Sequence, residues 1–392
     1  MSETKKKKAA LIVILILVLL LLLSAVGVGI WAILRYGGSY HPIPIVTRPD
    51  SYTLPDYPPL DSEPPSTSPD TSPDTAPDTS PDTAPDTSPD SSPDTDPPAV
   101  TDPPVTTGPS EQQTLPKDEP SGDHYPIYGQ MPIYKVERKD PNVINVLLLG
   151  TDSLNLQTDR GRTDTMIVVS YHKVSGEVKL VSLLRDGLVP IEGYDWNRLN
   201  AAYVFGGVGL AINTVNQLLD LDIQHFVLLD VKGAKEAVGM IGPITVPITK
   251  EEADFHEQTW GYRLSVGTSK LEGEQILNHF TLYHLDNDIQ RSRRQRQVLS
   301  AAGRAVLENN SLPQILSLVD RGLTLVKTNM DLPLLTSLAT SVFSHRNDLK
   351  IDTAALPAEG NYRYGWYKGM CILSFDIERA REELDAFLYG NG

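Results

Sequence analysis

Short apolar runs of strand length open the part of the chain whose pattern predicts a folded domain. Residues 143–149 form one such run, and it ends in the polar residues 150–152. Residues 165–171 and 177–184 are two further strand-like segments, separated by a turn at residues 175–176. Apolar runs bounded by turn residues are typical of buried strands. The pattern therefore predicts a buried strand followed by a β-hairpin.

Apolar residues at helical spacing alternate with strand-like runs through the rest of this region. The predicted helices are residues 210–219, 231–241, 271–280, 291–308, 314–321, 332–343 and 376–388. The further predicted strands are residues 226–229, 244–248 and 349–356. Helices that alternate with strands usually cover the faces of a sheet. We therefore expect an α/β fold, a layered α/β/α domain with a central mixed sheet.

The longest apolar run lies close to the N-terminus. Residues 9–34 carry no charge and consist mainly of Leu, Ile and Val. Because a bilayer core needs about 20 apolar residues in a helix, this run predicts one transmembrane helix. Four lysines at residues 5–8 precede it and only Arg35 follows, so residues 1–8 are expected in the cytoplasm and the folded domain outside the cell membrane. A cleaved signal peptide is the alternative, although its apolar core is usually shorter.

A segment rich in Pro, Asp, Ser and Thr, residues 35–125, separates this helix from the folded domain. Residues 36–125 hold 22 of the 31 prolines and 17 acidic residues against 2 basic ones. Within them, residues 68–95 are seven tetrads of the SPDT type. Such a composition cannot bury enough apolar surface to fold, and its charges repel one another. The segment is therefore predicted to be a disordered stalk.

Charge and cysteine usage exclude several classes of protein. The net charge is −16, and most of it belongs to the stalk, so the folded part lacks the basic surface that nucleic-acid binding needs. The single cysteine, Cys371, excludes an intramolecular disulfide and a cysteine-based zinc site. Neither a Walker-type phosphate loop nor a G-x-S-x-G nucleophile motif occurs.

Carboxylates follow or precede the predicted strands at positions suited to metal binding. Asp152 ends one strand and Asp164 opens the next, so the two meet at one edge of the sheet if these strands are neighbours. Arg185 and Asp186 end the third strand and converge on the same edge. Mg²⁺ takes oxygen ligands and usually keeps waters and substrate phosphates. The sequence therefore predicts a Mg²⁺ site here.

Arginines gather around the same predicted edge. Arg162 lies in the loop between the two aspartates, and Arg291 and Arg294 share one face of the first turn of a helix. Helix N-termini favour anions, and guanidinium groups bind phosphate through two parallel hydrogen bonds. Together with the metal, these arginines predict a clamp for pyrophosphate.

Each of these features has a plainer explanation when taken alone. A strand-end aspartate is more often a turn residue or a helix cap than a ligand, and an arginine run is usually a solvated helix face. His279 and His284 fit ordinary surface or core positions better than metal ligation. The predicted Mg²⁺ site and pyrophosphate clamp require the carboxylates and arginines to lie close together in the fold.

Five sequence blocks occur in an order and spacing that resemble a known family. They are NVLLLGTDS, RTDTMIVVSYHKVSGEVKLVSLLRD, RLNAAYVFGG, LEGEQIL and DIQRSRRQRQVL, and they lie within residues 143–302. The chain resembles the LytR-CpsA-Psr family, whose members are similar to phosphotransferases that move a glycopolymer from undecaprenyl pyrophosphate to peptidoglycan. The resemblance implies an α/β fold with an apolar tunnel for the polyprenyl chain. We therefore expect a catalytic domain of this kind at residues 126–310. The helices and strand predicted after residue 313 indicate an α/β extension, residues 311–392, packed on the same domain.

The resemblance assigns roles to residues that match the family's motifs. It implies that Asp152 and Asp164 bind Mg²⁺. The substrate-binding residues that it implies are Arg162, Arg185, Arg291, Arg294 and Gln295. One of Asp152, Asp164 and Asp186 is expected to act as the general base, and the sequence does not choose among them. Asn200 is expected to be a cap or loop brace.

The chain departs from the family's pattern at Ser153, Leu184, Thr281 and Tyr283. Thr281 and Tyr283 stand where the family carries two arginines that contact phosphate. A charge-assisted contact of this kind contributes about 1.5–3 kcal/mol, so their loss weakens the clamp unless other groups replace them. Arg293 and Arg296 are the candidates in the sequence.

The resemblance implies a Mg²⁺-dependent phosphotransferase that attaches a teichoic-acid-type or capsule-type polymer to peptidoglycan through a phosphodiester bond. Two alternatives stay open. One is a binding or scaffolding protein that holds polyprenyl-linked intermediates, which the replacement of two arginines favours. The other is a hydrolase of polyprenyl pyrophosphate with water as the acceptor.

Overall fold

The computed structural model describes residues 43–48, 53–61, 130–153, 161–282 and 285–390. A six-stranded sheet forms its centre, in the order β11 (Val326–Thr328), β8 (His225–Leu229), β3 (Val143–Thr151), β4 (Thr163–His172), β5 (Val178–Leu183) and β12 (Ile351–Leu356). Strand β3 is parallel to β8 and antiparallel to β4, and β5 is antiparallel to β4 and parallel to β12. The predicted mixed sheet is therefore confirmed.

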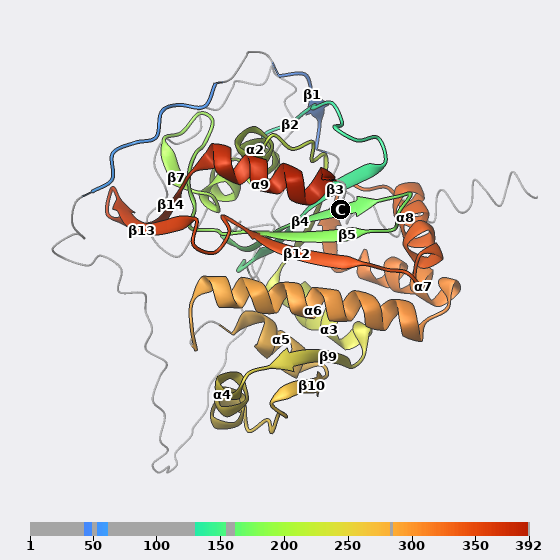
Figure 1. Ribbon diagram of the computed structural model, residues 1–392. Coiled ribbons are helices and arrows are strands. Elements are labelled where there is room, and N and C mark those ends of the chain that lie inside the picture. The colour runs from blue at the N-terminus through green and yellow to red at the C-terminus, as the bar shows by residue number, and fades with distance from the viewer. Residues whose placement is uncertain (1–42, 49–52, 62–129, 154–160, 283–284, 391–392) are drawn as a thin grey trace, which may run out of the picture.

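Helices cover both faces of this sheet (Figure 1). One face carries α2 (Ala201–Leu219) and α9 (Ile377–Tyr389). The opposite face carries α3 (Val231–Ile241), α5 (Glu274–Thr281) and α6 (Asp288–Asn309). The result is the expected α/β/α layering.

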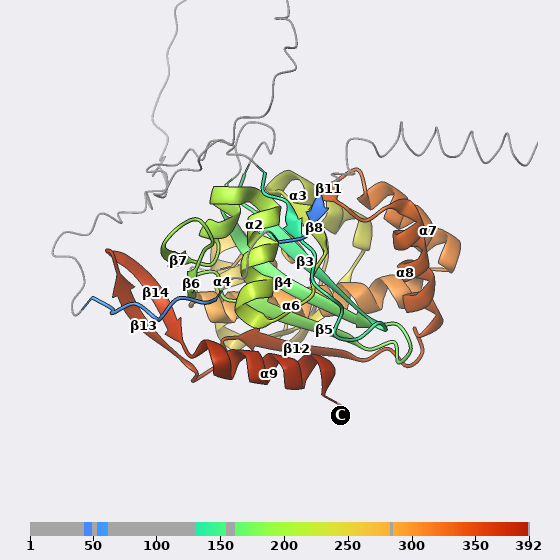
Figure 2. The ribbon, with the colours of Figure 1, turned by 90° about the horizontal axis from the view of Figure 1, so that it is seen from above.

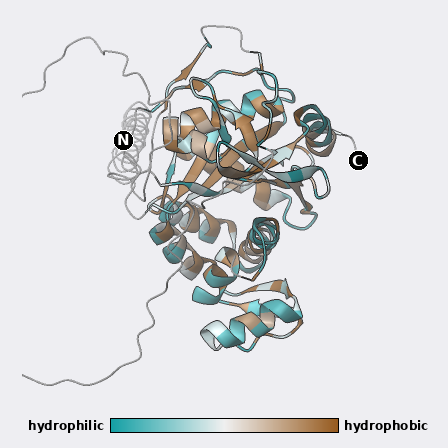
Figure 3. Ribbon diagram, turned by 90° about the vertical axis from the view of Figure 1, so that its left-hand side faces the viewer, coloured by the Kyte–Doolittle hydropathy of each residue, from teal (hydrophilic) through white to brown (hydrophobic). Residues whose placement is uncertain are grey.

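The main core lies between the sheet and α2. Alternate residues of the central strands, among them Leu147, Leu149, Val168 and Val181, pack against α2, of which nearly every residue is buried. Figure 3 shows hydrophobic residues concentrated along the sheet and α2. Burying one such side chain contributes about 1.5–3 kcal/mol, so this layer is the main source of stability.

Helix α2 begins at Ala201 rather than at residue 210, where we predicted it. Two glycines, Gly206 and Gly207, interrupt the helical pattern, and Gly207 adopts a φ of 67°, which kinks the helix. A Cβ at Gly209 would lie 1.8 Å from the carbonyl oxygen of Met131, so this turn approaches a neighbouring backbone too closely for a side chain. Close packing thus requires glycines, and these glycines hide the helical pattern in the sequence.

A small subdomain extends from the face that carries α6. It contains β9 (Ile244–Ile248), α4 (Lys250–Trp260) and β10 (Gly267–Leu271), and β9 pairs with β10 antiparallel. Thr249 and Glu252 form a capping box that starts α4. The helix predicted from residue 271 is wrong at its start, because Leu271 ends β10 and pairs with Ile244.

The segment after residue 311 does more than pack on the domain. Helices α7 (Leu312–Gly322) and α8 (Leu332–Ser344) lie at one end of the molecule (Figure 2). Strands β11 and β12, which come from this same segment, are the two edge strands of the central sheet. The predicted extension is therefore built into the fold, because β5 and β8 need partners for their outer backbone groups.

Two small hairpins complete the layer above the sheet. The strands are β6 (Leu188–Pro190), β7 (Trp196–Arg198), β13 (Tyr362–Tyr367) and β14 (Met370–Phe375), paired as β6–β7 and β13–β14. Neither hairpin was predicted, because their aromatic and polar residues do not alternate clearly.

Part of the predicted stalk is ordered. Strand β1 (Ile45–Val46) pairs parallel with β2 (Ile133–Tyr134), and Ile43 is buried in the main core. Residues 53–61 run beside β13, where the backbone N–H of Asp61 donates to the carbonyl of Trp366 at 2.9 Å. The expected disorder is therefore wrong for these residues, because they carry enough apolar side chains to pack.

The SPDT repeats and the predicted membrane helix at residues 9–34 lie outside the described residues. Among the helices that the structure does describe, none has the length and apolar character to cross a bilayer. The predicted anchor stays a prediction.

Candidate functional site

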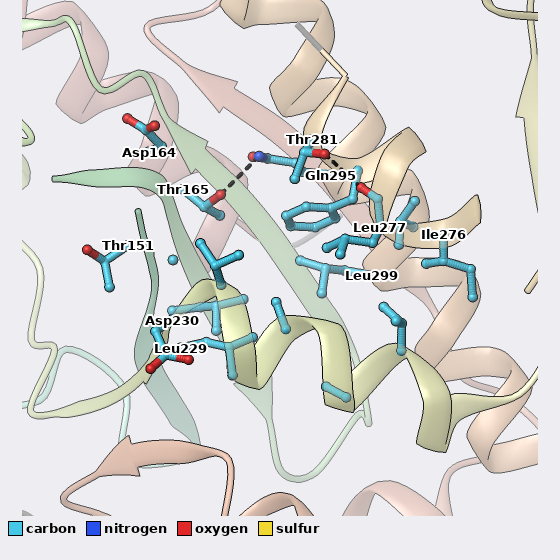
Figure 4. A pocket seen from close by; sticks show the side chains of 18 of the residues that line it. Thr151, Asp164, Thr165, Leu229, Asp230, Ile276, Leu277, Thr281, Gln295 and Leu299 are labelled. Carbon is cyan, nitrogen blue, oxygen red and sulfur yellow. Dashed lines mark hydrogen bonds between the residues drawn. The ribbon is translucent and has the colours of Figure 1, made fainter. Parts of the chain in front are cut away.

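A cavity of about 350 Å³ lies between the sheet and helices α3, α5 and α6. Its apolar lining residues include Leu148, Val231, Ala237, Val238, Ile241, Ile276, Phe280, Val298 and Leu299. Its polar lining residues include Thr151, Asp152, Asp164, Thr165, Asp230, Arg291 and Gln295. Figure 4 shows the polar groups Thr151, Asp164 and Asp230 toward one end of the cavity and Ile276 and Leu277 toward the other.

The two predicted metal ligands are brought to this polar end by the β3–β4 ladder. The ladder shifts register between Gly150 and Thr151. Beyond it, the Asp152 carboxylate accepts the backbone N–H of Arg162 at 2.6 Å, and the Asp152 N–H donates to the Arg162 carbonyl at 3.2 Å. Asp152 and Asp164 both line the cavity.

Gly161 is required for this arrangement. Its φ is +65°, a conformation that side-chain-bearing residues rarely adopt. A Cβ there would lie 2.4 Å from Oδ1 of Asp152 and 2.6 Å from the backbone nitrogen of Ser153. The glycine therefore lets the returning chain approach Asp152 and fix its carboxylate.

Arg185 lies at the end of β5 within a group of carboxylates. Its Nη1 donates to Asp164, and its Nε lies 3.3 Å from Asp288 and 3.7 Å from Asp186. Burial lowers the pKa of Arg185, but the charges of Asp164, Asp288 and Asp186 outweigh burial and raise it above its usual value. The guanidinium is therefore permanently charged.

Arg291 extends the same network from the first turn of α6. Its Nη2 donates to the Asp288 carboxylate and, at 3.3 Å, to the Asp164 carbonyl. Its side chain is buried, with 7% exposed, and it lines the cavity. Arg185 and Arg291 thus converge on Asp288 from two different elements.

Asp288 is a site residue that sequence reasoning missed. Burial raises the pKa of Asp288 above its usual value, although the charges of Arg185 and Arg291 lower it in part. Asn287 caps α6 by accepting the Gln290 N–H at 3.1 Å, which places Asp288 in the first turn. The available signal was its spacing of three residues from Arg291, which puts both side chains on one helix face.

Two further aspartates, Asp186 and Asp230, lie near the site. Asp186 lies 3.6 Å from Arg198, a second residue that the sequence analysis did not single out. Asp230 lines the cavity and caps α3 by accepting the Gly233 N–H at 2.7 Å. Its place just before a predicted helix was the signal that could have found it.

Arg294 does not join the phosphate clamp that we predicted. It is fully buried, and its guanidinium donates to both carboxylate oxygens of Asp286 at 2.7 Å. It also donates to Glu252 at 3.2 Å and to the Leu282 carbonyl. These partners hold it between α6, α4 and the end of α5, away from the cavity lining. The prediction that Arg291 and Arg294 act together therefore conflicts with the structure.

The other predicted contacts differ in how closely they approach the site. Gln295 lines the cavity and donates to Thr165 at 2.9 Å (Figure 4). Arg162 is joined to Asp152 through the backbone and is not a lining residue. Asn200 precedes α2 without a side-chain cap, and its N–H donates to the Arg185 carbonyl at 3.2 Å, which fits a loop brace.

The positions that depart from the family's pattern show no replacement for the expected arginines. Thr281 lines the cavity and donates to the Leu277 carbonyl at 2.9 Å, and Tyr283 lies outside the described residues. Arg293 is exposed and Arg296 is buried, and neither lines the cavity. Burial lowers the pKa of Arg296 to about 10.

Three further positions of interest, Ser153, Leu184 and His279, lie apart from the cavity lining. Ser153 and Leu184 are buried beside the site. His279 is a core residue, as expected, and His284 lies outside the described residues.

The donor set fits Mg²⁺ bound partly by substrate. No group of three or more His, Cys, Asp or Glu residues converges on a metal position within the part of the chain that the structure describes. The Asp152 carboxylate accepts a backbone N–H, and the Asp164 carboxylate pairs with Arg185. One or two carboxylates together with substrate phosphates are a usual Mg²⁺ environment.

Together these features define a class of fold with a cavity that is charged at one end and apolar along the rest. An α/β/α domain places arginines and carboxylates at one end of a cavity whose remainder is apolar. The model described as the LytR_cpsA_psr family matches residues 106–383, and the chain belongs to the LytR-CpsA-Psr family.

Similar proteins agree with this membership. The polyisoprenyl-teichoic acid–peptidoglycan teichoic acid transferase TagU of Oceanobacillus iheyensis is 29% identical over 255 residues, which are 63% of this chain and 76% of TagU. A solved structure of TagT bound to LIIa-WTA has a TM-score of 0.54 at 22% identity and covers 65% of this chain and 94% of TagT.

A second TagT structure carries a bound octaprenyl pyrophosphate lipid. Its TM-score is 0.50 at 21% identity, and the match covers 65% of this chain and 94% of that one. These structures share the fold of the present chain.

Proposed function

We propose that this chain is a phosphotransferase that moves a glycopolymer from a polyprenyl pyrophosphate carrier to peptidoglycan. The observation that carries the proposal is the cavity, whose apolar interior ends at Asp152, Asp164 and Arg291. A diphosphate with a polyprenyl tail has the same division into an anionic head and an apolar chain. The names of the TagU relative and of the lipid-bound TagT structure support this choice.

The tail binds by apolar burial. Helices α3, α5 and α6 contribute apolar side chains such as Val238, Ile276 and Val298 to the cavity. Removing such side chains from water is favourable. A polyprenyl chain that fills this space gains roughly 25 cal/mol for each Å² of apolar surface removed from water. The cavity therefore selects a lipid carrier over a soluble nucleotide sugar.

The head group binds when its phosphate oxygens become ionic partners of the arginines. Arg185 and Arg291 are already held beside Asp164 and Asp288, so diphosphate oxygens enter a cluster whose guanidinium groups are in position. Fixed donors of this kind stabilise charge that develops during phosphoryl transfer without reorganising. Asp152 and Asp164 would hold Mg²⁺, which when bound supplies further neutralisation of phosphate charge.

The transfer step follows from this placement. The acceptor sugar hydroxyl attacks the phosphorus that carries the polymer and forms a new oxygen–phosphorus bond. The bond from that phosphorus to the bridging oxygen breaks, and polyprenyl phosphate leaves with the electron pair. The hydroxyl proton passes to an aspartate, and the choice among Asp152, Asp164 and Asp186 stays open. No covalent enzyme intermediate is required.

The proposal includes the position of the protein in the cell. Residues 9–34 would anchor the chain in the cell membrane, and the lysines before them would keep the N-terminus in the cytoplasm. The domain then acts on the outer side of the bilayer, beside the acceptor.

The test uses the full chain with lipid-linked polymer, Mg²⁺ and peptidoglycan fragments. Arg291→Ala and Arg185→Ala are each expected to reduce transfer at least about tenfold, because each removes a charge-assisted contact. Chelating Mg²⁺ is expected to reduce transfer as well. Arg293→Ala, on the exposed face of the same helix, is the matched control and should leave transfer unchanged. Undiminished transfer by both site variants would contradict the proposal.

The same assay separates two other functions. Thr281, which lines the cavity where the family has an arginine, favours a protein that binds the lipid-linked polymer without transferring it. Such a protein would bind donor and yield no coupled product. A hydrolase would instead release phosphorylated polymer with water as the acceptor.

A further inference from the structure

The β13–β14 hairpin is attached directly to the candidate site. The backbone N–H of Leu373 donates to the Asp186 carbonyl at 2.8 Å, and Gly187 forms a bridge with Leu373. A Cβ at Gly187 would lie 3.1 Å from the ring of Phe375, so the hairpin and this loop are tightly packed. The hairpin therefore holds a defined position relative to Asp186 and its neighbour Arg185.

The two faces of this hairpin differ in their surroundings. Tyr367 and Ile372 point toward Leu188 and Trp196, with which they form a small buried core. Side chains alternate along a strand, so Tyr362, Tyr364 and Trp366 share the opposite face, on which Tyr362 packs against the main core and Trp366 is half-buried. The Tyr364 side chain is 61% exposed, and its ring meets that of Tyr362 edge-on at 5.9 Å.

Tyr364 also lies within electrostatic reach of the arginine cluster. Partial burial raises the pKa of its hydroxyl, and the neighbouring Tyr362 and then Asp288 raise it further. Asp288 is the carboxylate that pairs with both Arg185 and Arg291. The charge of Asp288 thus links the exposed Tyr364 ring to the two arginines that we assign to the diphosphate.

The contacts run in order from the cavity to this aromatic face. Arg291 lines the cavity and pairs with Asp288, Asp288 pairs with Arg185, and Arg185 lies beside Asp186, which holds the hairpin. Figure 1 shows the hairpin and the start of α6 at the same end of the molecule. The arginine cluster therefore lies between the hairpin and the lipid cavity.

We infer that the aromatic face formed by Tyr362, Tyr364 and Trp366 binds the acceptor, a strand of linked amino sugars from peptidoglycan. In phosphoryl transfer the attacking and leaving oxygens are roughly in line. The leaving group occupies the cavity, so the acceptor hydroxyl approaches from the opposite side, where this face lies. Aromatic rings pack against the apolar C–H faces of sugars while their polar edges stay in water.

This inference rests on the proposed function and adds the binding site of its second substrate. A donor polymer could also contact aromatic rings, but its attachment to the phosphorus does not have to lie opposite the leaving group. The geometry of displacement therefore favours the acceptor, and donor binding becomes an outcome of the test.

The kinetic test compares variants of the full chain at saturating donor while soluble peptidoglycan fragments are varied. Tyr364→Ala is expected to raise the KM for the fragments about tenfold and to leave the KM for donor unchanged. Tyr364→Phe keeps the ring and should behave as the unmodified chain. Val174→Ala, at the β4–β5 turn and 68% exposed, is the control for loss of an exposed side chain.

A binding test needs no turnover. Cys371 is the single cysteine of the chain, is exposed, and pairs with Trp366 across the hairpin, so a dye attached to it reports on this face. Peptidoglycan fragments without donor should change the dye signal, and Tyr364→Ala should weaken that response about tenfold. Thermal unfolding of Tyr364→Ala should match that of the unmodified chain, because the residue is exposed.

The outcomes distinguish this inference from the proposed function. Fragment binding that depends on the Tyr364 ring supports the acceptor site even if the chain transfers nothing. Transfer with an unchanged fragment KM in Tyr364→Ala overturns the acceptor site and leaves the proposed function standing. A raised KM for donor alone also overturns it, because the ring would then contact the other substrate.

Discussion

Individual charged residues in this protein take their roles from their partners rather than from their place in a motif. Arg291 and Arg294 lie one helical turn apart, but Arg291 pairs with Asp288 beside the cavity whereas Arg294 is enclosed by Asp286 and Glu252. Burying an ion pair is favourable only when its hydrogen bonds are complete. Both terminal nitrogens of Arg294 have such partners, Asp286, Glu252 and the Leu282 carbonyl, and the residue serves the fold.

Replacing Arg294 should therefore damage stability first. Arg294→Met leaves two carboxylates without their partner, and the free energy of unfolding is expected to fall by about 3–5 kcal/mol. Denaturant unfolding measures this change. Arg293→Ala, the exposed neighbour, is expected to alter it by less than about 0.5 kcal/mol. If Arg294→Met left the stability unchanged but abolished donor binding, the result would support the predicted role of Arg294 in binding phosphate.

At the scale of elements, two helices meet through a buried histidine pair. His256 of α4 and His279 of α5 are fully buried, with Nε2 of the first 3.3 Å from Nδ1 of the second. Burial lowers the pKa of His256 to about 4, and burial together with His256 and Arg294 lowers the pKa of His279 to about 3. Both are neutral at pH 7, and α5 lines the cavity with its other side chains.

This pair predicts a loss of stability in mild acid. The folded pKa values lie below the unfolded value of about 6.5, so the unfolded chain binds protons first. The contribution of the neutral histidine pair to stability is complete above a pH of about 6.5. It declines as the pH falls toward the pKa values of the folded state. Urea unfolding between neutral and mildly acid pH measures the slope. The double variant His256→Gln and His279→Gln should show a shallower slope, and equal slopes would argue against this origin.

At the scale of the whole molecule, the C-terminal part completes the domain. Strands β11 and β12 close the two sides of the sheet, and α9 packs on α2. Arg381 of α9 donates to the carbonyls of Leu218 and Gln217 at 2.6 and 2.8 Å, and so satisfies the C-terminal end of α2. Residues far apart in sequence thus share one core.

A chain that ends at residue 310 is therefore not expected to fold. It lacks both edge strands and exposes the face of α2 that α9 covers. Near-ultraviolet circular dichroism should show loss of fixed tertiary packing, and limited proteolysis should degrade the chain. A chain that ends at residue 390 is the control and should keep both properties. A compact, donor-binding 1–310 chain would refute this view.

Most of the elements around the cavity follow from the local pattern of the chain. Strands β3, β4 and β5 and helices α3 and α6 were predicted close to their observed bounds, because hydrophobic periodicity depends only on local chain geometry. The sequence also places Asp152 and Asp164 at strand ends, and both line the cavity.

Charge pairing and the exposure of faces, in contrast, arise from contacts between distant segments. The partners of Arg294 come from α4 and from the segment before α6, and Asp288 joins Arg185 across the sheet edge. The hairpin sequence YRYGWY is aromatic on both faces, so its pattern could not tell that Tyr364 is exposed while Tyr367 is buried. Charge pairing and exposure depend on which distant segments approach one another, and local periodicity carries no information about that.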